Sequence, residues 1–137
     1  MTTTPQLVPA EELRKLWPTL EPMVEAVRAR VHGRWIPADV YSFCVSGKAG
    51  LYVDYDELGQ ITGCIVLRRF EDWGHTVLSV WVCYNAHPEQ TIVDYFPWLV
   101  QTAADMRCNI IEWSGRRGHN RLIDGVRVVD TIMQYEV

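Results

Sequence analysis

The first apolar pattern along the chain is helical. Beginning near Pro9, hydrophobic residues recur at intervals of one, three and four, which places them on one stripe of a helix. Because Pro18 and Pro22 lack the N–H that an interior turn uses, we expect a break or kink near Trp17. The stripe consists of Leu13, Leu16, Trp17, Leu20, Val24, Val27 and Val31.

The pattern predicts that a second part of this helix ends around His32 and Gly33. The pattern also predicts a short helix over residues 37–46, which begins at a proline and ends before Gly47.

The middle of the chain is rich in β-branched and aromatic residues, as is typical of strands. Three such stretches follow one another, at 50–55, 60–70 and 75–84, and polar turns at 56–59 and 72–74 separate them. The third stretch is apolar on both faces, so we expect it to lie inside the sheet.

The last third returns to helical spacing and then to strand composition. A helix is predicted from His87 through Met106, with a kink at Pro97. A strand at 109–113, a brief helix at 120–123 and a final strand at 126–137 follow.

This order predicts one α/β domain over residues 1–137, with residues 1–8 flexible. The three consecutive strands are antiparallel neighbours, whereas the strand, helix and strand of 75–113 form a crossover between parallel neighbours. We therefore expect a mixed, mostly antiparallel sheet with helices on both faces.

Charge and composition exclude several classes of function. The net charge is −4 and the only lysines are Lys15 and Lys48, which argues against a nucleic-acid partner. The chain contains neither an apolar stretch that would span a membrane nor a secretory signal, so we expect a cytoplasmic protein. The four cysteines and four histidines lack the spacing of metal ligands, and no metal is expected.

The element order resembles that of the GNAT superfamily of N-acetyltransferases over most of residues 9–137. The turn at Gly125-Val-Arg127, followed by a strand to the C-terminus, is similar to the ending of that family. The stretch from Trp113 to Leu122 also resembles small GNAT-like proteins of tailed phages, which would place the chain in a host cytoplasm or a virion. The resemblance implies acetyl-CoA as cofactor and an amine as acceptor.

The family's phosphate-binding loop is degenerate here. The corresponding residues, Tyr84 to Thr91, include neither glycine nor arginine; Pro88 removes an N–H donor and Glu89 adds a negative charge. The resemblance and the remaining helix-start N–H groups give four candidates for contact with the cofactor: Val82, Tyr84, Gln90 and Thr91.

Catalytic residues are not fixed by any motif. Counting back four residues from Gly125 reaches Arg121, where the family often places a tyrosine that protonates the departing thiolate. An arginine cannot donate that proton, because it stays protonated. Tyr84 is a candidate for that role, and Glu112 is a candidate for the base that takes the amine proton.

Two further features favour contacts with other molecules. Arg116, Arg117 and Arg121 lie in a Gly- and Arg-rich turn that suits an anion or a partner's acidic surface, or is simply solvated. Trp35 and Trp73 lie in turns, and we expect one of them in an interface.

Two hypotheses for the function follow. The first is an acyl-CoA-dependent N-acetyltransferase with an atypical cofactor site. The second is a non-catalytic GNAT-fold binding or assembly protein, phage-encoded and virion-associated, which binds a protein partner or forms a homo-oligomer.

Overall fold

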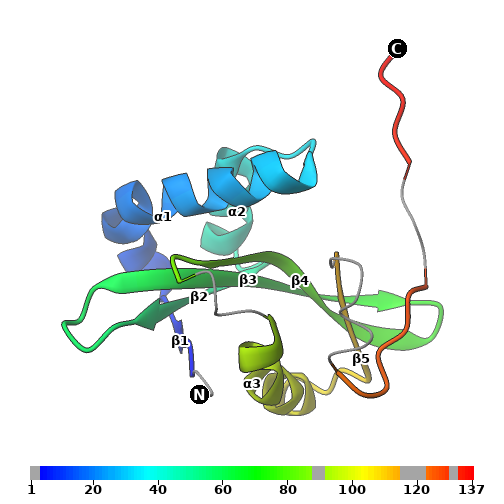
Figure 1. The fold of residues 1–137 in the computed structure, drawn as a ribbon. Coiled ribbons are helices and arrows are strands. Elements are labelled where there is room, and N and C mark those ends of the chain that lie inside the picture. The colour runs from blue at the N-terminus through cyan, green and yellow to red at the C-terminus, as the bar shows by residue number, and fades with distance from the viewer. Residues whose placement is uncertain (1–3, 88–91, 115–122, 130–132) are drawn as a thin grey trace.

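A computed structural model describes residues 4–87, 92–114, 123–129 and 133–137 (Figure 1). Its helices and strands, in chain order, are β1 (Gln6–Leu7), α1 (Ala10–Val31), α2 (Pro37–Val45), β2 (Gly50–Tyr55), β3 (Ile61–Asp72), β4 (His75–Asn85), α3 (Ile92–Asp105) and β5 (Ile110–Trp113).

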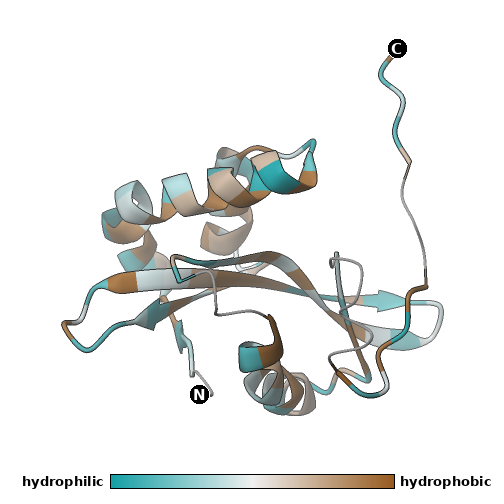
Figure 2. Cartoon of the chain, in the orientation of Figure 1, coloured by the Kyte–Doolittle hydropathy of each residue, from teal (hydrophilic) through white to brown (hydrophobic). Residues whose placement is uncertain are grey.

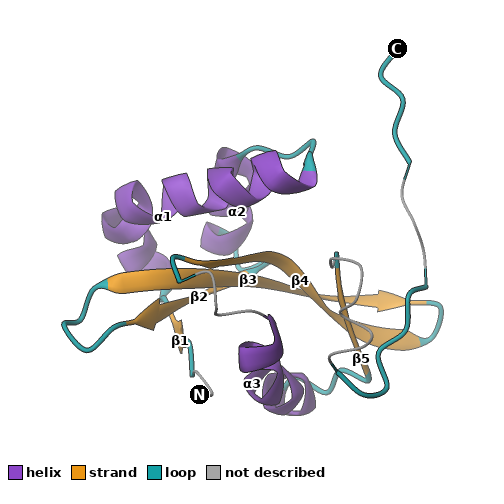
Figure 3. Cartoon of the chain, viewed as in Figure 1, coloured by secondary structure: helices purple, strands orange, loops and turns teal. Residues whose placement is uncertain are grey.

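The strands form one five-stranded sheet in the order β1-β2-β3-β4-β5. All neighbours are antiparallel except β4 and β5, which are parallel and joined by α3 (Figure 3). The single-domain α/β architecture, the meander and the crossover are therefore confirmed, and β4 has neighbours on both sides as expected of an interior strand.

The helices cover both faces of the sheet. α1 and α2 lie on one face and α3 lies on the other (Figure 1). Figure 2 shows hydrophobic residues along the middle of β3 and β4, where the helices cover them, and hydrophilic residues in the hairpin that joins the two strands. This burial on both faces is the main stabilising term of the fold.

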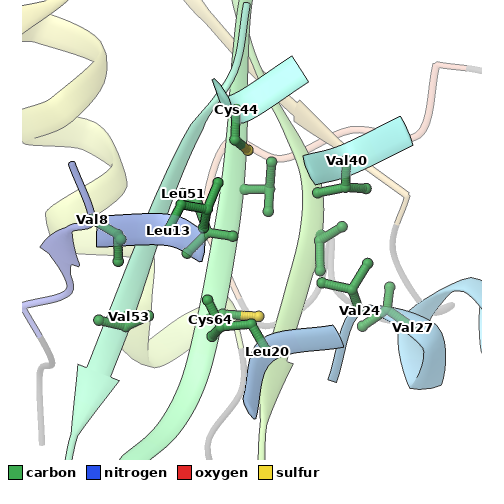
Figure 4. Close-up of a cluster of buried hydrophobic side chains, with 12 residues drawn as sticks. Val8, Leu13, Leu20, Val24, Val27, Val40, Cys44, Leu51, Val53 and Cys64 are labelled. Carbon is green, nitrogen blue, oxygen red and sulfur yellow. The ribbon is translucent and has the colours of Figure 1, made fainter. Parts of the chain in front are cut away.

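Each face has its own hydrophobic core. Residues of α1 and α2, such as Leu20 and Val40, pack on Leu51, Val53 and Cys64 of the sheet (Figure 4). On the other face, α3 packs through Tyr95 and Leu99 on Ile65, Leu67 and Leu78.

Helix α1 continues from Ala10 to Val31 through both prolines, so of the two expected outcomes near Trp17, a break or a kink, the break is wrong. Pro18 and Pro22 are four residues apart and both are exposed. The carbonyls that lose an N–H partner therefore face water, which hydrates them, while the apolar stripe stays packed on the sheet.

The N-terminal segment contributes to the sheet. Gln6 and Leu7 pair with β2, and Val8 is buried and donates its N–H to the carbonyl of Leu51 at 2.9 Å. Residues 1–3, part of the segment that we expect to be flexible, lie outside the described residues. A two-residue strand is too short for its pattern to be recognised in the sequence.

The predicted final strand at 126–137 is wrong for the residues that the structure describes. Residues 126–129 and 133–137 belong to no strand, and Figure 1 shows the C-terminal end extending away from the sheet. Met133 and Tyr135 are 88% and 90% exposed. A strand-like sequence forms a strand only when an edge pairs with it, and here no described residue does so. The helix predicted at 120–123 falls, except for buried Ile123, outside the described residues.

Candidate functional site

Strand β5 ends halfway along β4. Val66 of β3 lies opposite Val82, but Leu67 lies opposite Val80, so Trp81 is an extra residue that forms a β-bulge. The parallel ladder with β5 also stops at this point, with Val80 opposite Trp113. Among the described residues, the outer edge of β4 beyond Val80 therefore has no partner strand. We call this unpaired edge, from Trp81 to Asn85, the β4 gap.

The backbone groups that face the β4 gap follow from the ladder. Ala86 donates its N–H to the carbonyl of Thr62 at 2.7 Å and so faces β3. Because successive residues of a strand face opposite sides, Val82 and Tyr84 also direct their backbone groups to β3, whereas Cys83 and Asn85 face the gap. Arg30 of α1 confirms the direction, since its Nη2 donates to the carbonyl of Cys83 at 3.3 Å.

The aromatic side chains around the gap pack on one or the other face of the sheet. The Trp81 ring contacts the rings of Trp35 and Phe43, at centroid distances of 5.6 and 5.3 Å, on the α2 side. Tyr84 is half-buried against the same core. Trp113 lies on the opposite side, with its ring 6.3 Å from that of Phe96. Trp35, one of the two interface candidates, thus has a partner inside the protein.

A hydrogen-bonded chain holds the end of β4. The Asn85 side chain accepts the N–H of His87 at 2.8 Å and donates to the hydroxyl of Tyr95 at 2.6 Å. That hydroxyl lies 3.3 Å from Oδ2 of Asp54 on β2, to which it donates. These hydrogen bonds join β2, β4 and α3.

Gly63 leaves room for the ends of Asn85 and Tyr95 to lie close to β3. A Cβ at this position would lie 2.6 Å from the carbonyl oxygen of Tyr84, 3.0 Å from Nδ2 of Asn85 and 3.2 Å from the hydroxyl of Tyr95. Only a glycine allows the three groups to meet on β3 without a shift.

Burial determines the protonation of the groups near the gap. Desolvation raises the pKa of the Cys83 thiol to about 11, against a smaller lowering effect of Arg30. The pKa of Tyr95 is raised well above its usual value, mainly by burial, although the hydrogen bond from Asn85 lowers it. Both groups are therefore neutral at physiological pH, and Cys83 is a poor nucleophile there.

Glu112, the predicted base, lies on β5 opposite Ser79 and is exposed. Its neighbours Ile111 and Trp113 pack on the α3 side, so alternation directs Glu112 to the α1 side of the sheet. Within the described part of the chain its carboxylate makes no hydrogen bond or ion pair.

The remaining predicted site residues, Gln90, Thr91, Arg116, Arg117 and Arg121, lie outside the described residues. Of the others, Val82 and Tyr84 lie on β4 along the gap, and Glu112 lies on β5, which ends where the gap begins. No sequence pattern indicated Arg30, which is 53 positions from Cys83, or the link between Asn85 and Tyr95.

Two kinds of site are not found among the described residues. No group of three or more His, Cys, Asp or Glu residues there is arranged to hold a metal ion. No helix of the described ranges is long and apolar enough to cross a membrane.

No protein-family model and no curated protein matches the sequence. Solved structures, in contrast, match over nearly its whole length. An aminoglycoside acetyltransferase from an uncultured soil metagenomic sample has a TM-score of 0.70 and 11% identity, covering 98% of this chain and 95% of its own. A ribosomal-protein-alanine N-acetyltransferase from Brucella melitensis biovar Abortus 2308 has a TM-score of 0.62 and 12% identity, covering 99% and 98%.

A probable acetyltransferase has a TM-score of 0.64 and 15% identity, covering 98% of this chain and 96% of its own. At such low identity the likeness concerns the fold and not the activity. The element order, the mixed sheet and these matches together establish that the chain has a GNAT-like fold.

Proposed function

We propose that this chain binds an acyl-CoA along the β4 gap and transfers the acyl group to an amine. The observation that supports this most directly is the coincidence of the Trp81 bulge with the end of the β4–β5 ladder. A strand that extends beyond its neighbour leaves unpaired backbone groups, and such groups bind extended, amide-containing ligands.

The arm of an acyl-CoA that carries the thioester suits this edge, because it is extended and contains amide groups. The N–H and C=O groups of Cys83 and Asn85 face the gap and would bond to these amides as they would to a neighbouring strand. Arg30 supplies a positive charge beside Cys83, which favours an anionic ligand.

The phosphate end would lie near the loop before α3. The Asn85 side chain already accepts the N–H of His87, so that N–H does not serve a phosphate. The sequence offers the N–H groups of Gln90 and Thr91 at the helix start instead. This donor set is smaller than that of a glycine-rich loop, and we expect weak cofactor binding.

Transfer joins the amine nitrogen to the acyl carbon and breaks the C–S bond, so one proton leaves the amine and one is taken up by the departing sulfur. We assign the first proton to the carboxylate of Glu112, which is exposed on β5. Tyr84, half-buried on β4, is the candidate donor of the second.

Isothermal titration with acetyl-CoA tests the proposal. Saturable binding is expected, and Arg30→Ala should weaken it several-fold, whereas Arg34→Ala removes the same charge from an exposed site and should not. Absence of heat at about 1 mM cofactor would mean a binding free energy weaker than about −4 kcal/mol and would reject the proposal.

Glu112→Gln should lower kcat and leave acetyl-CoA affinity unchanged.

The alternative function is a non-catalytic binding or assembly module, phage-encoded or otherwise. Trp73 favours it: this residue lies at the tip of the β3–β4 hairpin, is 95% exposed and has a φ of 49°, which is costly for a tryptophan. Exposed tryptophans are frequent anchors of protein interfaces. Loss of a co-purifying partner, or of self-association, in Trp73→Ser would support this function, and an inert monomer in both forms would contradict it.

A further inference from the structure

A second site lies at the opposite end of the sheet from the β4 gap and does not depend on the proposed function. We propose that it binds an extended acidic peptide, which adds as a strand to β3. The site is an open depression of about 690 Å³, within the usual range of ligand pockets, roughly 300–1,000 Å³. Its lining includes Phe43, Lys48, Tyr52, Leu67, Arg68 and Arg69.

The free strand edge is the first support. β2 begins at Gly50, opposite Leu67, whereas β3 continues to Asp72. Beyond Leu67, β3 therefore has no described partner strand on the β2 side. The backbone of Ala86 and Thr62 fixes the direction along β3: even-numbered residues face β4, so Arg69 and Glu71 direct their N–H and C=O groups to the open side.

The charge around this edge is the second support. Among the described residues that line the depression, three are cationic and none is acidic, in a protein of net charge −4. Within the described part of the chain, Lys48, Arg68 and Arg69 form no ion pair with a carboxylate. A carboxylate that approached would thus find partners that no internal acid has neutralised.

The cations are also held in place. The Arg68 guanidinium lies 5.1 Å from the ring centroids of both Phe43 and Trp81, and the Lys48 ammonium lies 5.5 Å from that of Phe43. Arg69 donates from Nε to the carbonyl of Met106 at 2.9 Å. Side chains fixed in this way lose less entropy when a ligand binds.

The positions of the cations on both faces of the sheet match a peptide that adds as a strand. Lys48 and Arg68 lie on the α2 side of the sheet, whereas Arg69, bonded to the end of α3, lies on the other side. Successive side chains of an added strand point to opposite faces, so two adjacent acidic residues would meet the two groups of cations. Glu71 and Asp72, farther along β3, would repel acids there and confine them to the Arg69 end.

Fluorescence anisotropy with a labelled Thr-Val-Glu-Glu-Val-Thr peptide tests this. We expect saturable binding at low salt that weakens about tenfold in Lys48→Glu and in Arg69→Glu, and about tenfold when the peptide carries Gln-Gln in place of Glu-Glu. Lys15→Glu makes the same charge change on exposed α1 and should leave the affinity unchanged. N-methylation of alternate peptide bonds, in the register that faces β3, should abolish binding.

Several results would overturn the proposal. Lack of saturation would do so, as would equal weakening by Lys15→Glu. Undiminished binding of the N-methylated peptide would exclude strand addition, and displacement of the peptide by equimolar inorganic phosphate would identify a site for small anions. A mass that doubles with protein concentration, and that Arg69→Glu returns to the monomer, would identify a second copy as the occupant instead.

Discussion

Gly63 and Tyr95 show how single residues shape the candidate site. Tyr95 is 1% exposed, yet its hydroxyl accepts a hydrogen bond from Asn85 and donates one to Asp54. A buried hydroxyl that lost these partners would cost free energy, so the bonds hold the end of β4 in one conformation. Gly63 provides the space in which they form.

Gly63→Ala should therefore lower the free energy of unfolding. The added Cβ would lie 2.6 Å from the backbone oxygen of Tyr84, which cannot move aside as a flexible side chain does. We expect a loss of about 1–3 kcal/mol, measured by urea unfolding. Tyr95→Phe relieves none of this backbone contact, so the double variant should remain destabilised. A stability equal to that of the parent would show that the strand shifts freely.

Buried thiols predict a pH dependence of stability. Burial raises the pKa of Cys44 from 9.0 to about 11 and that of Cys64 from 9.0 to about 12. Because the folded-state pKa lies above the unfolded one, the stabilisation is complete below pH 9.0 and is lost as the pH rises toward 11 and 12. The urea midpoint should fall across this window, and the fall should be shallower in Cys44→Ala/Cys64→Ala. If the urea midpoint fell equally steeply with pH in both proteins, the two thiols would not be the cause of the pH dependence.

Among the elements, α1 carries a cost that its packing offsets. Two prolines interrupt its hydrogen bonds on the exposed side, while Leu13, Leu20, Val24 and Val27 remain buried against the sheet. The burial of these side chains outweighs the unmade bonds, since each contributes about 1.5–3 kcal/mol. The helix thus persists for tertiary reasons rather than through the propensity of its sequence.

Pro22→Ala should raise the free energy of unfolding by about 1–3 kcal/mol, because alanine restores the N–H and removes the clash with the preceding turn. Thermal unfolding followed by circular dichroism measures the change. Thr19→Ala, also exposed on α1, is the matched control and should have a much smaller effect. A decrease in stability in Pro22→Ala would indicate that a bend at this proline is needed for packing.

For the molecule as a whole, two interior strands of the sheet each have a stretch of edge without a described partner. Among the described residues, β3 is unpaired beyond Leu67 on one side and β4 beyond Val80 on the other. Each edge lies beside a cation, Arg69 or Arg30, that bonds to a backbone carbonyl. The fold thus offers two places where an extended anionic ligand would complete the sheet.

Removal of residues 133–137 tests how the C-terminal end contributes. These residues are exposed and belong to no strand. The free energy of unfolding of the truncated chain should therefore lie within about 0.5 kcal/mol of that of the parent. A final strand paired to the sheet would instead bury Met133 and Tyr135, and its removal would lower the free energy of unfolding. A loss of more than about 2 kcal/mol would therefore support that strand.

The sequence by itself determined what local periodicity encodes. It predicted the helices, the three-stranded meander, the crossover and the two covered faces, because amphipathic patterns repeat within a few residues. It also placed Val82, Tyr84 and Glu112 on the two strands that border the β4 gap. The break in α1 and the final strand were wrong, because helix packing and strand pairing depend on distant partners.

The tertiary structure alone decided the details of the site. The Trp81 bulge, the contact of Arg30 with Cys83 and the bond of Tyr95 to Asp54, 41 positions away, depend on register and on the approach of separate elements. A one-residue shift in register reverses which groups face an edge, and no local pattern specifies where a ladder ends. The chemistry available at each edge was therefore visible only once the strands were paired.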